Sequence, residues 1–231
     1  MSCSHKIYVI IPAAGSGSRM GKNSNKLFMK IGDKTVIERT LDAFNNYGNI
    51  YAIVVTNEEN LEELRRLQNT KYPFIKSVII GGNSRTESVS KGVDELANIE
   101  DGPTADDYVF IHDGARCMIT KDVIDNCVEG LADNKVCVAG VQAKNTIKVV
   151  HDGIVESTPD RSTLYEVQTP QCFHYDVLKK SYDNAKENNI EATDDTALAE
   201  LLGYKVAIVE GSYSNIKITT PEDIIFAQGI S

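Results

Sequence analysis

Residues 6–21 read KIYVIIPAAGSGSRMG, an apolar run followed directly by a loop of small residues. Lys6–Ala13 is short and rich in Ile and Val, which is typical of a strand buried inside a sheet. In an open parallel sheet, ligands bind past the carboxyl ends of the strands. The order of strand and small-residue loop therefore predicts a ligand-binding loop near the start of an α/β domain.

Beyond this stretch, short β-branched runs alternate with amphipathic segments along most of the chain. The expected further strands are Ile50–Thr56, Lys76–Ile80, Tyr108–His112, Val136–Val141 and Val206–Val209. The expected helices are Thr35–Asn45, Glu58–Gln68, Tyr175–Asn188 and those that follow the caps Ser84, Thr120, Thr193 or Asp194, and Thr220. This alternation predicts a Rossmann-like, doubly wound α/β fold, with a mostly parallel sheet and helices on both faces. We expect a single domain over residues 1–231.

One segment breaks the alternation. Asn145–Val150 and Ile154–Ser157 are joined by His151-Asp152-Gly153, and Asp-Gly between two apolar runs is a hairpin signal. We therefore expect a protruding β-hairpin arm at about residues 142–166. Because such arms often pair subunits, a homodimer joined through the arm is our hypothesis.

The composition limits the class of protein. The chain has 231 residues, 42% hydrophobic and 25% charged, with a formal net charge of −9 that argues against a nucleic-acid binder. No apolar run is long enough for a membrane span or a signal peptide. The five cysteines form no C-x-x-C pair, and we interpret them as reduced core thiols. We expect a cytoplasmic protein without nucleic-acid or membrane partners.

The small-residue loop fits neither of two familiar nucleotide motifs. It lacks the Gly-Lys-Ser/Thr sequence that ends a P-loop. Gly21 comes one position too late for the G-x-G-x-x-G pattern of dinucleotide-binding folds. Instead the segment adds two cations, Arg19 and Lys26. The plain alternative is that these cations only solvate a loop. Together with the glycines, they favour a site for a triphosphate whose α-phosphorus is attacked.

Positive charge is what such a reaction requires. A substrate phosphate, with a second pKa of about 6, can itself be the nucleophile, so no Ser, Cys or His nucleophile is needed. The site must supply positioning and cations for the departing pyrophosphate. Asp113 ends the strand Tyr108–His112, where a carboxylate suits Mg²⁺, although a turn-forming Asp before Gly114 is the plain alternative. We predict a nucleotidyltransferase that joins a nucleoside monophosphate to a second phosphorylated substrate.

Other features have weaker local signals. Gly81-Gly82 is either a plain strand-to-helix turn or a loop whose backbone contacts the base of the nucleotide. Lys217 lies in the alternating run Asn215–Thr219 and, on local sequence alone, is a solvated strand lysine.

Two other functional classes of protein remain as alternatives. An NAD-dependent oxidoreductase would usually have an acid where this chain has Thr56-Asn57, and a non-catalytic protein would bind the nucleoside triphosphate without releasing pyrophosphate.

The segment Pro12–Gly21, with Lys26, resembles the nucleotide-binding signature of sugar and polyol phosphate nucleotidyltransferases. Six further segments, in this order and spacing, resemble the 2-C-methyl-D-erythritol 4-phosphate cytidylyltransferase family of non-mevalonate isoprenoid biosynthesis. They are Gly81–Val89, His112–Arg116, Asn145–Lys148, Gln168–Phe173, Thr193–Asp195 and Asn215–Asp223. The resemblance runs from Ile7 to about Gln228.

The resemblance implies transfer of CMP from CTP to 2-C-methyl-D-erythritol 4-phosphate, with Mg²⁺ as cofactor and a homodimer. It implies that the catalytic residues are Arg19, Lys26 and Lys217. It implies nucleotide contacts from Ala13, Ala14, Gly15, Gly82, Asn83, Ser88 and Gly114. It implies polyol phosphate contacts from Asp113, Arg116, Thr146, Arg161, Thr169 and Thr193, with Asp113 also binding the metal. Thr146 and Arg161, on the arm, would serve the site of the partner.

Two positions depart from the family pattern. Cys117 stands where Pro is usual, and Asn145 stands where Asp is usual; both border the expected polyol site. A sister group acts on ribitol 5-phosphate and typically has Asp-Ser-Val-Arg where this chain has Asp113-Gly-Ala-Arg116. That group also lacks the paired acids after Thr193. Methylerythritol phosphate is therefore the preferred substrate, and ribitol 5-phosphate is the alternative.

Overall fold

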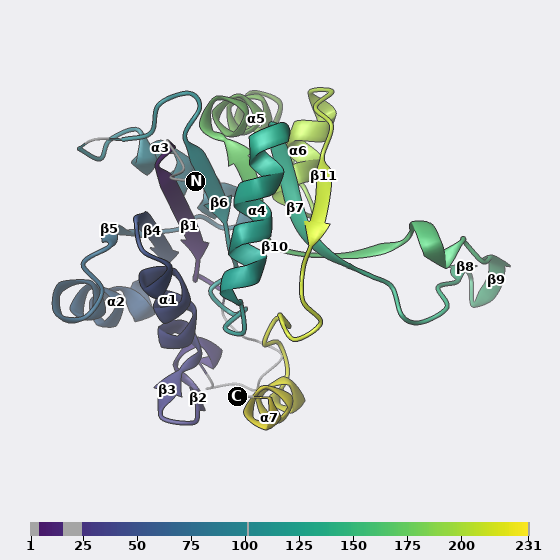
Figure 1. The fold of residues 1–231 in the computed structure, drawn as a ribbon, viewed down its shortest axis with the longest axis horizontal. Helices are drawn as coiled ribbons and strands as arrows, with labels where there is room; N and C mark the ends of the chain where they lie inside the picture. The colour runs from purple at the N-terminus through teal and green to yellow at the C-terminus, as the bar shows by residue number, and fades with distance from the viewer. Residues whose placement is uncertain (1–4, 16–24, 101, 231) are drawn as a thin grey trace.

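The computed structural model describes residues 5–15, 25–100 and 102–230, which are built around one seven-stranded sheet (Figure 1). The strand order is β11-β7-β10-β6-β1-β4-β5. The strands are β1 (Ile7–Pro12), β4 (Ile50–Thr56), β5 (Ile75–Ile80), β6 (Tyr108–Ile111), β7 (Val136–Gln142), β10 (Tyr165–His174) and β11 (Ala207–Glu210). All neighbouring pairs are parallel except the two that β10 makes with β6 and β7.

β1 lies inside the sheet, paired with β4 on one side and β6 on the other. Its side chains alternate between two apolar clusters, with Ile7, Val9 and Ile11 in one cluster and Tyr8 and Ile10 in the other. A strand with a core on each face needs apolar residues at every position. This explains the unbroken apolar run and confirms the predicted buried strand.

Helices cover both faces of the sheet, as the doubly wound pattern predicts (Figure 1). Four of them contribute to the first cluster: α1 (Val36–Tyr47), α2 (Glu58–Thr70), α4 (Lys121–Asp133) and α7 (Pro221–Gly229). Three contribute to the second: α3 (Arg85–Leu96), α5 (Tyr175–Asn188) and α6 (Asp195–Leu201). Of the two possible caps of α6, it is Asp194 whose side chain accepts the Ala197 N–H.

β10 is the main element that the sequence pattern did not predict. It runs antiparallel between β6 and β7, and its register shifts between Val167 and Gln171. The first three residues are exposed and the remainder is buried, so no single period describes the strand. Pro170 also interrupts the run, and a proline argues against a central strand in sequence-based reasoning.

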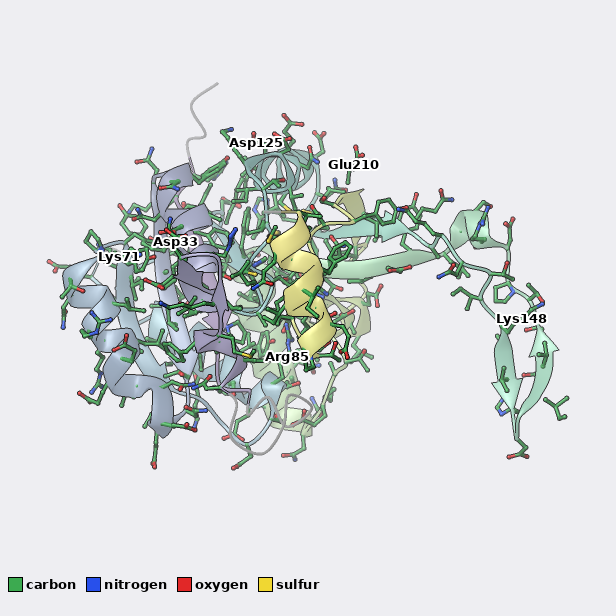
Figure 2. The ribbon with its side chains drawn as sticks, turned by 90° about the horizontal axis from the view of Figure 1, so that it is seen from below. Asp33, Lys71, Arg85, Asp125, Lys148 and Glu210 are labelled. Carbon is green, nitrogen blue, oxygen red and sulfur yellow. The ribbon has the colours of Figure 1, made fainter. Side chains whose placement is uncertain are left out.

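The arm leaves the body between β7 and β10 and extends far from the sheet (Figures 1 and 2). Its tip is the hairpin of β8 (Val149–His151) and β9 (Ile154–Ser157), so the first strand is shorter than expected. Asp152 and Gly153 have φ values of 49° and 78°. Positive φ at both central positions is the geometry that an Asp-Gly hairpin turn requires.

The remaining elements are small. β2 (Lys30–Ile31) pairs with β3 (Lys34–Thr35), and two 3₁₀ turns lie at Lys26–Phe28 and Arg161–Thr163. The run 215–219 forms no strand; instead Ile218 is fully buried and its N–H donates to the Ala115 carbonyl at 2.8 Å. No helix in the described part of the chain is both long and apolar enough to cross a membrane.

Cys117, Cys127, Cys137 and Cys172 are free and buried, as predicted for core thiols, while Cys3 lies outside the described residues. Packing of α4 on β7 brings the Cys137 thiol to 3.4 Å from the Cys127 carbonyl. The ten-residue spacing of these two cysteines therefore has a packing consequence that sequence analysis did not anticipate. Burial raises the pKa of Cys117 to about 11, so its thiol is unreactive at neutral pH.

Candidate active site

A cavity of about 480 Å³ opens where β1 and β6 end. Its walls come from the loop after β1, the turn at Lys26–Phe28, the loop between β5 and α3, the residues after β6, and the segment before α7. The predicted residues in this lining are Ala13, Ala14, Gly15, Lys26, Gly82, Asn83, Ser88, Asp113 and Lys217. Arg19 lies outside the described residues.

A smaller cavity of about 220 Å³ is lined by four of the residues predicted to hold the polyol phosphate: Asp113, Arg116, Thr169 and Thr193. Both cavities are lined by Arg85, Asp113 and Lys217. Three charged side chains therefore stand where the two spaces meet. A group held in one cavity can react there with a group held in the other.

Asp113 is the electrostatic centre of this junction. Its carboxylate lies 2.7 Å from Lys217 Nζ, 3.4 Å from Arg85 Nε and 4.0 Å from Arg116 Nε. Burial alone would raise the pKa of Asp113, but the positive charges of Arg85 and Lys217 lower it to about 2. Asp113 is therefore ionised at neutral pH, and the cations around it leave a positive excess that suits phosphate groups.

A network of hydrogen bonds fixes the backbone of the turn that follows β6. His112 Nε2 donates to the Arg116 carbonyl at 3.0 Å, so in the neutral ring Nδ1 accepts from the Thr169 hydroxyl at 3.1 Å. The same hydroxyl accepts from the Asp113 N–H at 3.1 Å. Burial lowers the pKa of His112 to about 4, which keeps the ring neutral. The Thr169 hydroxyl thus makes both of these hydrogen bonds within the protein. His112 is a further member of the site that sequence analysis did not single out.

Arg116 reaches the smaller cavity from the same turn. Its Nη1 donates to the Asn215 carbonyl at 2.8 Å, while its buried Nε has no hydrogen-bond partner. A buried guanidinium N–H without a partner costs free energy unless a ligand satisfies it. Arg116 is therefore suited to bind a phosphate in the smaller cavity.

The glycine pair after β5 is shaped by Ser88. The Ser88 hydroxyl accepts the Gly82 N–H at 3.0 Å and donates to the Ser84 carbonyl at 2.8 Å. A Cβ at Gly81 would come within 2.6 Å of that hydroxyl, which explains the need for glycine there. Ser88 thus holds the loop in place rather than presenting a free hydroxyl to a ligand.

Gly114 does not line either cavity. Its N–H donates to the Pro12 carbonyl at 3.1 Å, and an added Cβ would lie 3.1 Å from an Ile37 methyl. The residue permits β6 to end close against β1. The predicted nucleotide contact of Gly114 is therefore replaced by a packing role: this glycine lets the chain after β6 lie close to β1.

Arg85 and Asp195 form part of the site although sequence analysis assigned neither a role. Both Asp195 oxygens accept from the Arg85 guanidinium at 2.7 Å. Both residues lie within segments that carry the family resemblance, but Asp195 reads locally as an acid at a helix start. They are 110 residues apart in the chain, so only the tertiary fold shows that they are partners.

The structure does not bring Thr146 and Arg161 to either cavity. Both are exposed on the arm, and Arg161 Nη1 donates to the Lys144 carbonyl at 2.9 Å. Figure 2 shows Lys148 on the arm, far from Arg85 in the body. Asn145 is also exposed on the arm, whereas Cys117 is packed in the core at 5% exposure and lines neither cavity.

Asp113 is the carboxylate that is best placed for a metal ion. Its Oδ1 lies 3.4 and 3.5 Å from Arg85 nitrogens, which are long contacts for charged partners. Within residues 5–15, 25–100 and 102–230, no cluster of three or more His, Cys, Asp or Glu side chains could hold a metal. One carboxylate facing a phosphate cavity fits Mg²⁺, which is usually bound by one or two carboxylates together with substrate phosphates.

Comparison with known proteins gives a consistent result. A family model described as 2-C-methyl-D-erythritol 4-phosphate cytidylyltransferase matches residues 7–231. The chain is 39% identical over 225 residues to the protein of that name from Syntrophotalea carbinolica, covering 96% of this chain and 94% of that protein. It is 40% identical over 227 residues to that from Halalkalibacterium halodurans, covering 96% and 95%.

Solved structures agree with the sequence matches. The 4-diphosphocytidyl-2C-methyl-D-erythritol synthase from Anaerococcus prevotii superposes with a TM-score of 0.84 at 30% identity, covering 98% of each chain. The 2-C-methyl-D-erythritol 4-phosphate cytidylyltransferase from Francisella tularensis gives a TM-score of 0.79 at 31% identity, covering 97% of this chain and 99% of the other. The similarity therefore includes the whole body and the arm.

Proposed function

Since this chain belongs to the 2-C-methyl-D-erythritol 4-phosphate cytidylyltransferase family, we propose that it transfers CMP from CTP to 2-C-methyl-D-erythritol 4-phosphate. Pyrophosphate is released, and the reaction is a step of the non-mevalonate pathway to isoprenoids. The observation that carries the proposal is the pair of cavities that share Arg85, Asp113 and Lys217. The full-length matches do not favour ribitol 5-phosphate as the substrate.

The larger cavity is the proposed place of CTP. Ala13, Ala14, Gly15, Gly82 and Asn83 line it, and small residues let a ligand approach the main chain closely. Arg19 and Lys26 are proposed to stabilise negative charge on the α-phosphate and on the departing pyrophosphate. Positive charge that is fixed in advance lowers the barrier because it needs no rearrangement during the reaction.

The smaller cavity is the proposed place of the polyol phosphate, with Arg116, Thr193 and Lys217 in its walls. A phosphate oxygen attacks the α-phosphorus of CTP, a new P–O bond forms, and the bond to the bridging oxygen of the pyrophosphate breaks. The attacking phosphate is largely dianionic at neutral pH, since its second pKa is about 6. No side chain has to remove a proton, so positioning and charge are the contributions of the protein.

Asp113 is proposed to hold Mg²⁺ together with the triphosphate, where the metal would neutralise phosphate charge. The paired contacts of Asp113 with Lys217 and Arg85 keep its carboxylate ionised for that role. The four buried free cysteines are in keeping with a reducing compartment and support a cytoplasmic location.

We further propose a homodimer in which the arm of one copy completes the site of the other. The support is that Thr146 and Arg161 are exposed on the arm and line neither cavity of their own chain. The tip also exposes Ile154 at 73% and Val155 at 53%, a composition that suits contact with a second copy. Symmetric homodimers are the commonest assemblies of soluble proteins.

The test is pyrophosphate release with CTP and Mg²⁺, offering 2-C-methyl-D-erythritol 4-phosphate and ribitol 5-phosphate in parallel. We expect strong release with the first substrate alone. Release with ribitol 5-phosphate alone would keep the chemistry and overturn the substrate. Calorimetry of CTP binding makes a negative result informative, because CTP binding without release with either substrate would overturn catalysis.

A further inference from the structure

Arg85 lies between two carboxylates that hold it unequally. Asp195 accepts two hydrogen bonds of 2.7 Å from Nη1 and Nη2, which is the bidentate geometry of a strong pair. Asp113 is 3.4 Å from Nε and 3.5 Å from Nη2 of the same guanidinium. Arg85 is therefore bound firmly on the Asp195 side and only approached by Asp113.

Asp195 is itself fixed in place. Its side chain is 1% exposed, and its backbone N–H donates to Gln171 Oε1 at 2.7 Å. Its carboxylate also accepts a short hydrogen bond from the Tyr182 hydroxyl. Asp195 is the first residue of α6, where the helix dipole favours a negative charge. Asp195 therefore acts as a rigid partner, and the position of the flexible Arg85 side chain follows from it.

The rest of this contact region joins the same two segments. The Ser84 hydroxyl donates to Glu191 at 2.7 Å, and the Ala192 N–H donates to the Thr86 hydroxyl at 3.4 Å. The start of α3, which borders the nucleotide cavity, is thus tied to the segment 191–195, which carries Thr193 of the polyol cavity. Among these ties, the Arg85–Asp195 pair is the one that reaches the junction of both cavities.

We propose that Asp195 is a positioning residue for the transfer step: it holds Arg85 between the two substrate cavities and prevents Arg85 from closing onto Asp113. The nearest other carboxylate to the guanidinium is that of Asp113. Without the charge of Asp195, Arg85 would pair with Asp113 at full strength. The junction would then lose a cation that faces both phosphates, and Asp113 would lose the oxygen available to a ligand.

This inference rests on the proposed function, and one set of variants tests it. Asp195→Asn keeps the shape of the side chain and removes its charge. Arg85→Gln and the double variant are made beside it. As a matched control, Glu63→Gln removes the carboxylate from the exposed Arg66–Glu63 pair, where Arg66 Nε lies 2.7 Å from Glu63. The measurements are kcat from pyrophosphate release, the Kd of CTP by calorimetry without the polyol phosphate, and Tm.

Asp195→Asn should lower kcat by about tenfold to a hundredfold, because preorganised charge at a reacting centre has effects of this size. The Kd of CTP should change by less than about threefold, since other residues line most of the nucleotide cavity. In the Arg85→Gln background, Asp195→Asn should cause little further loss, because its partner is already gone. Asp195→Glu should restore part of the rate, and Glu63→Gln should match the wild type.

Two results would overturn the inference. One is a wild-type kcat for Asp195→Asn; the other is a set of losses that multiply in the double variant, which would indicate a structural role independent of Arg85. If Asp195→Asn does not fold, Tyr182→Phe removes one hydrogen bond to Asp195 and should lower kcat several-fold by the same Arg85-dependent route. A wild-type protein that releases no pyrophosphate would instead contradict the proposed function.

Discussion

The body and the arm present their predicted site residues in opposite ways. In the body, Asp113 is 7% exposed and Thr169 is 3% exposed, and each is held by several hydrogen bonds or ion pairs. On the arm, Thr146 and Arg161 are exposed, and the paired strands at the tip bury none of their residues. Both regions belong to the same family pattern, yet only one of them is preorganised within a single chain.

The difference indicates where each part of the function is determined. The body can fix the charges for CTP by its own packing, because the turn at Asp113 is tied to β10 and to the segment before α7. The base of the arm contacts Tyr213 of the body, but every residue of the tip strands β8 and β9 is exposed. We therefore expect Thr146 and Arg161 to contribute to catalysis only in an assembly where a second surface fixes them. Four predictions test this contrast, beginning with the largest expected effect.

Lys26→Ala should lower kcat on the order of 10²-fold or more, because Lys26 lines the nucleotide cavity and its charge is preorganised. Steady-state pyrophosphate release measures the effect. Lys148→Ala on the arm removes the same kind of charge from an exposed position, where Lys148 Nζ contacts the Thr158 hydroxyl. If the two variants lost activity equally, the contrast between body and arm would be wrong.

The free energy of unfolding should fall by about 2 kcal/mol between pH 8 and pH 5 because of His112. Burial lowers the pKa of His112 from 6.5 to about 4. Between these two pH values the histidine of the unfolded chain binds a proton, whereas that of the folded chain stays neutral. This contribution is complete above pH 6.5 and is lost as the pH falls toward 4. Urea unfolding at several pH values measures it.

Substitution of the buried histidine itself gives the comparison for this measurement. His112→Gln should reduce the pH dependence of the free energy of unfolding. A wild-type slope that His112→Gln does not alter would show that other groups cause the loss at low pH.

Arg161→Ala should raise the KM for the polyol phosphate by about tenfold and that for CTP much less, because it removes a contact to one substrate only. Mixing this variant with Lys26→Ala tests whether the contact comes from a second copy. In a mixed dimer, one site would have both its own Lys26 and the partner's Arg161. At a polyol phosphate concentration well below KM, where each variant alone has low activity, about a quarter of the wild-type activity should appear, since half of the dimers are mixed and each has one complete site. No recovery after subunit exchange would contradict the shared site.

Ile154→Ala should change the unfolding free energy of the isolated chain by less than about 0.5 kcal/mol, because Ile154 is 73% exposed. The matched change Ile10→Ala, at a fully buried position of β1, should cost about 2–5 kcal/mol. Urea unfolding at protein concentrations low enough to separate the subunits measures both. A large cost for Ile154→Ala under those conditions would mean that the arm packs within its own chain.

Much of this molecule could be predicted from local sequence because its signals are local. The apolar run of β1, the caps of α3 and α7, and the Asp-Gly turn each depend on a few neighbouring residues, and the doubly wound fold follows from their order. β10 was not predicted, because its exposed beginning and its Pro170 break the strand period. The site was predicted in part: many residues that line the two cavities were predicted, whereas Arg85 was not assigned a role and Arg19 lies outside the described residues.

The interactions that hold the site together could not be read from the sequence. Arg85 and Asp195 are 110 residues apart, and His112 and Thr169 are 57 apart. Each residue, taken alone, has an ordinary local explanation as a helix start, a strand end or a polar position in a sheet. Their roles come from contacts that only the crossing of β6, β10, α3 and α6 creates.

The buried cysteines allow the opening of the core to be followed in time. Cys127, Cys137 and Cys172 have no exposed surface, and Cys117 has 5%. A thiol reagent can modify them only when the surrounding element opens, so the rate of labelling reports the free energy of that opening. They lie on α4, on β7, on β10 and just after β6. Mass spectrometry of the labelled positions would therefore show which strand beside the arm separates first, in the native enzyme and without any substitution.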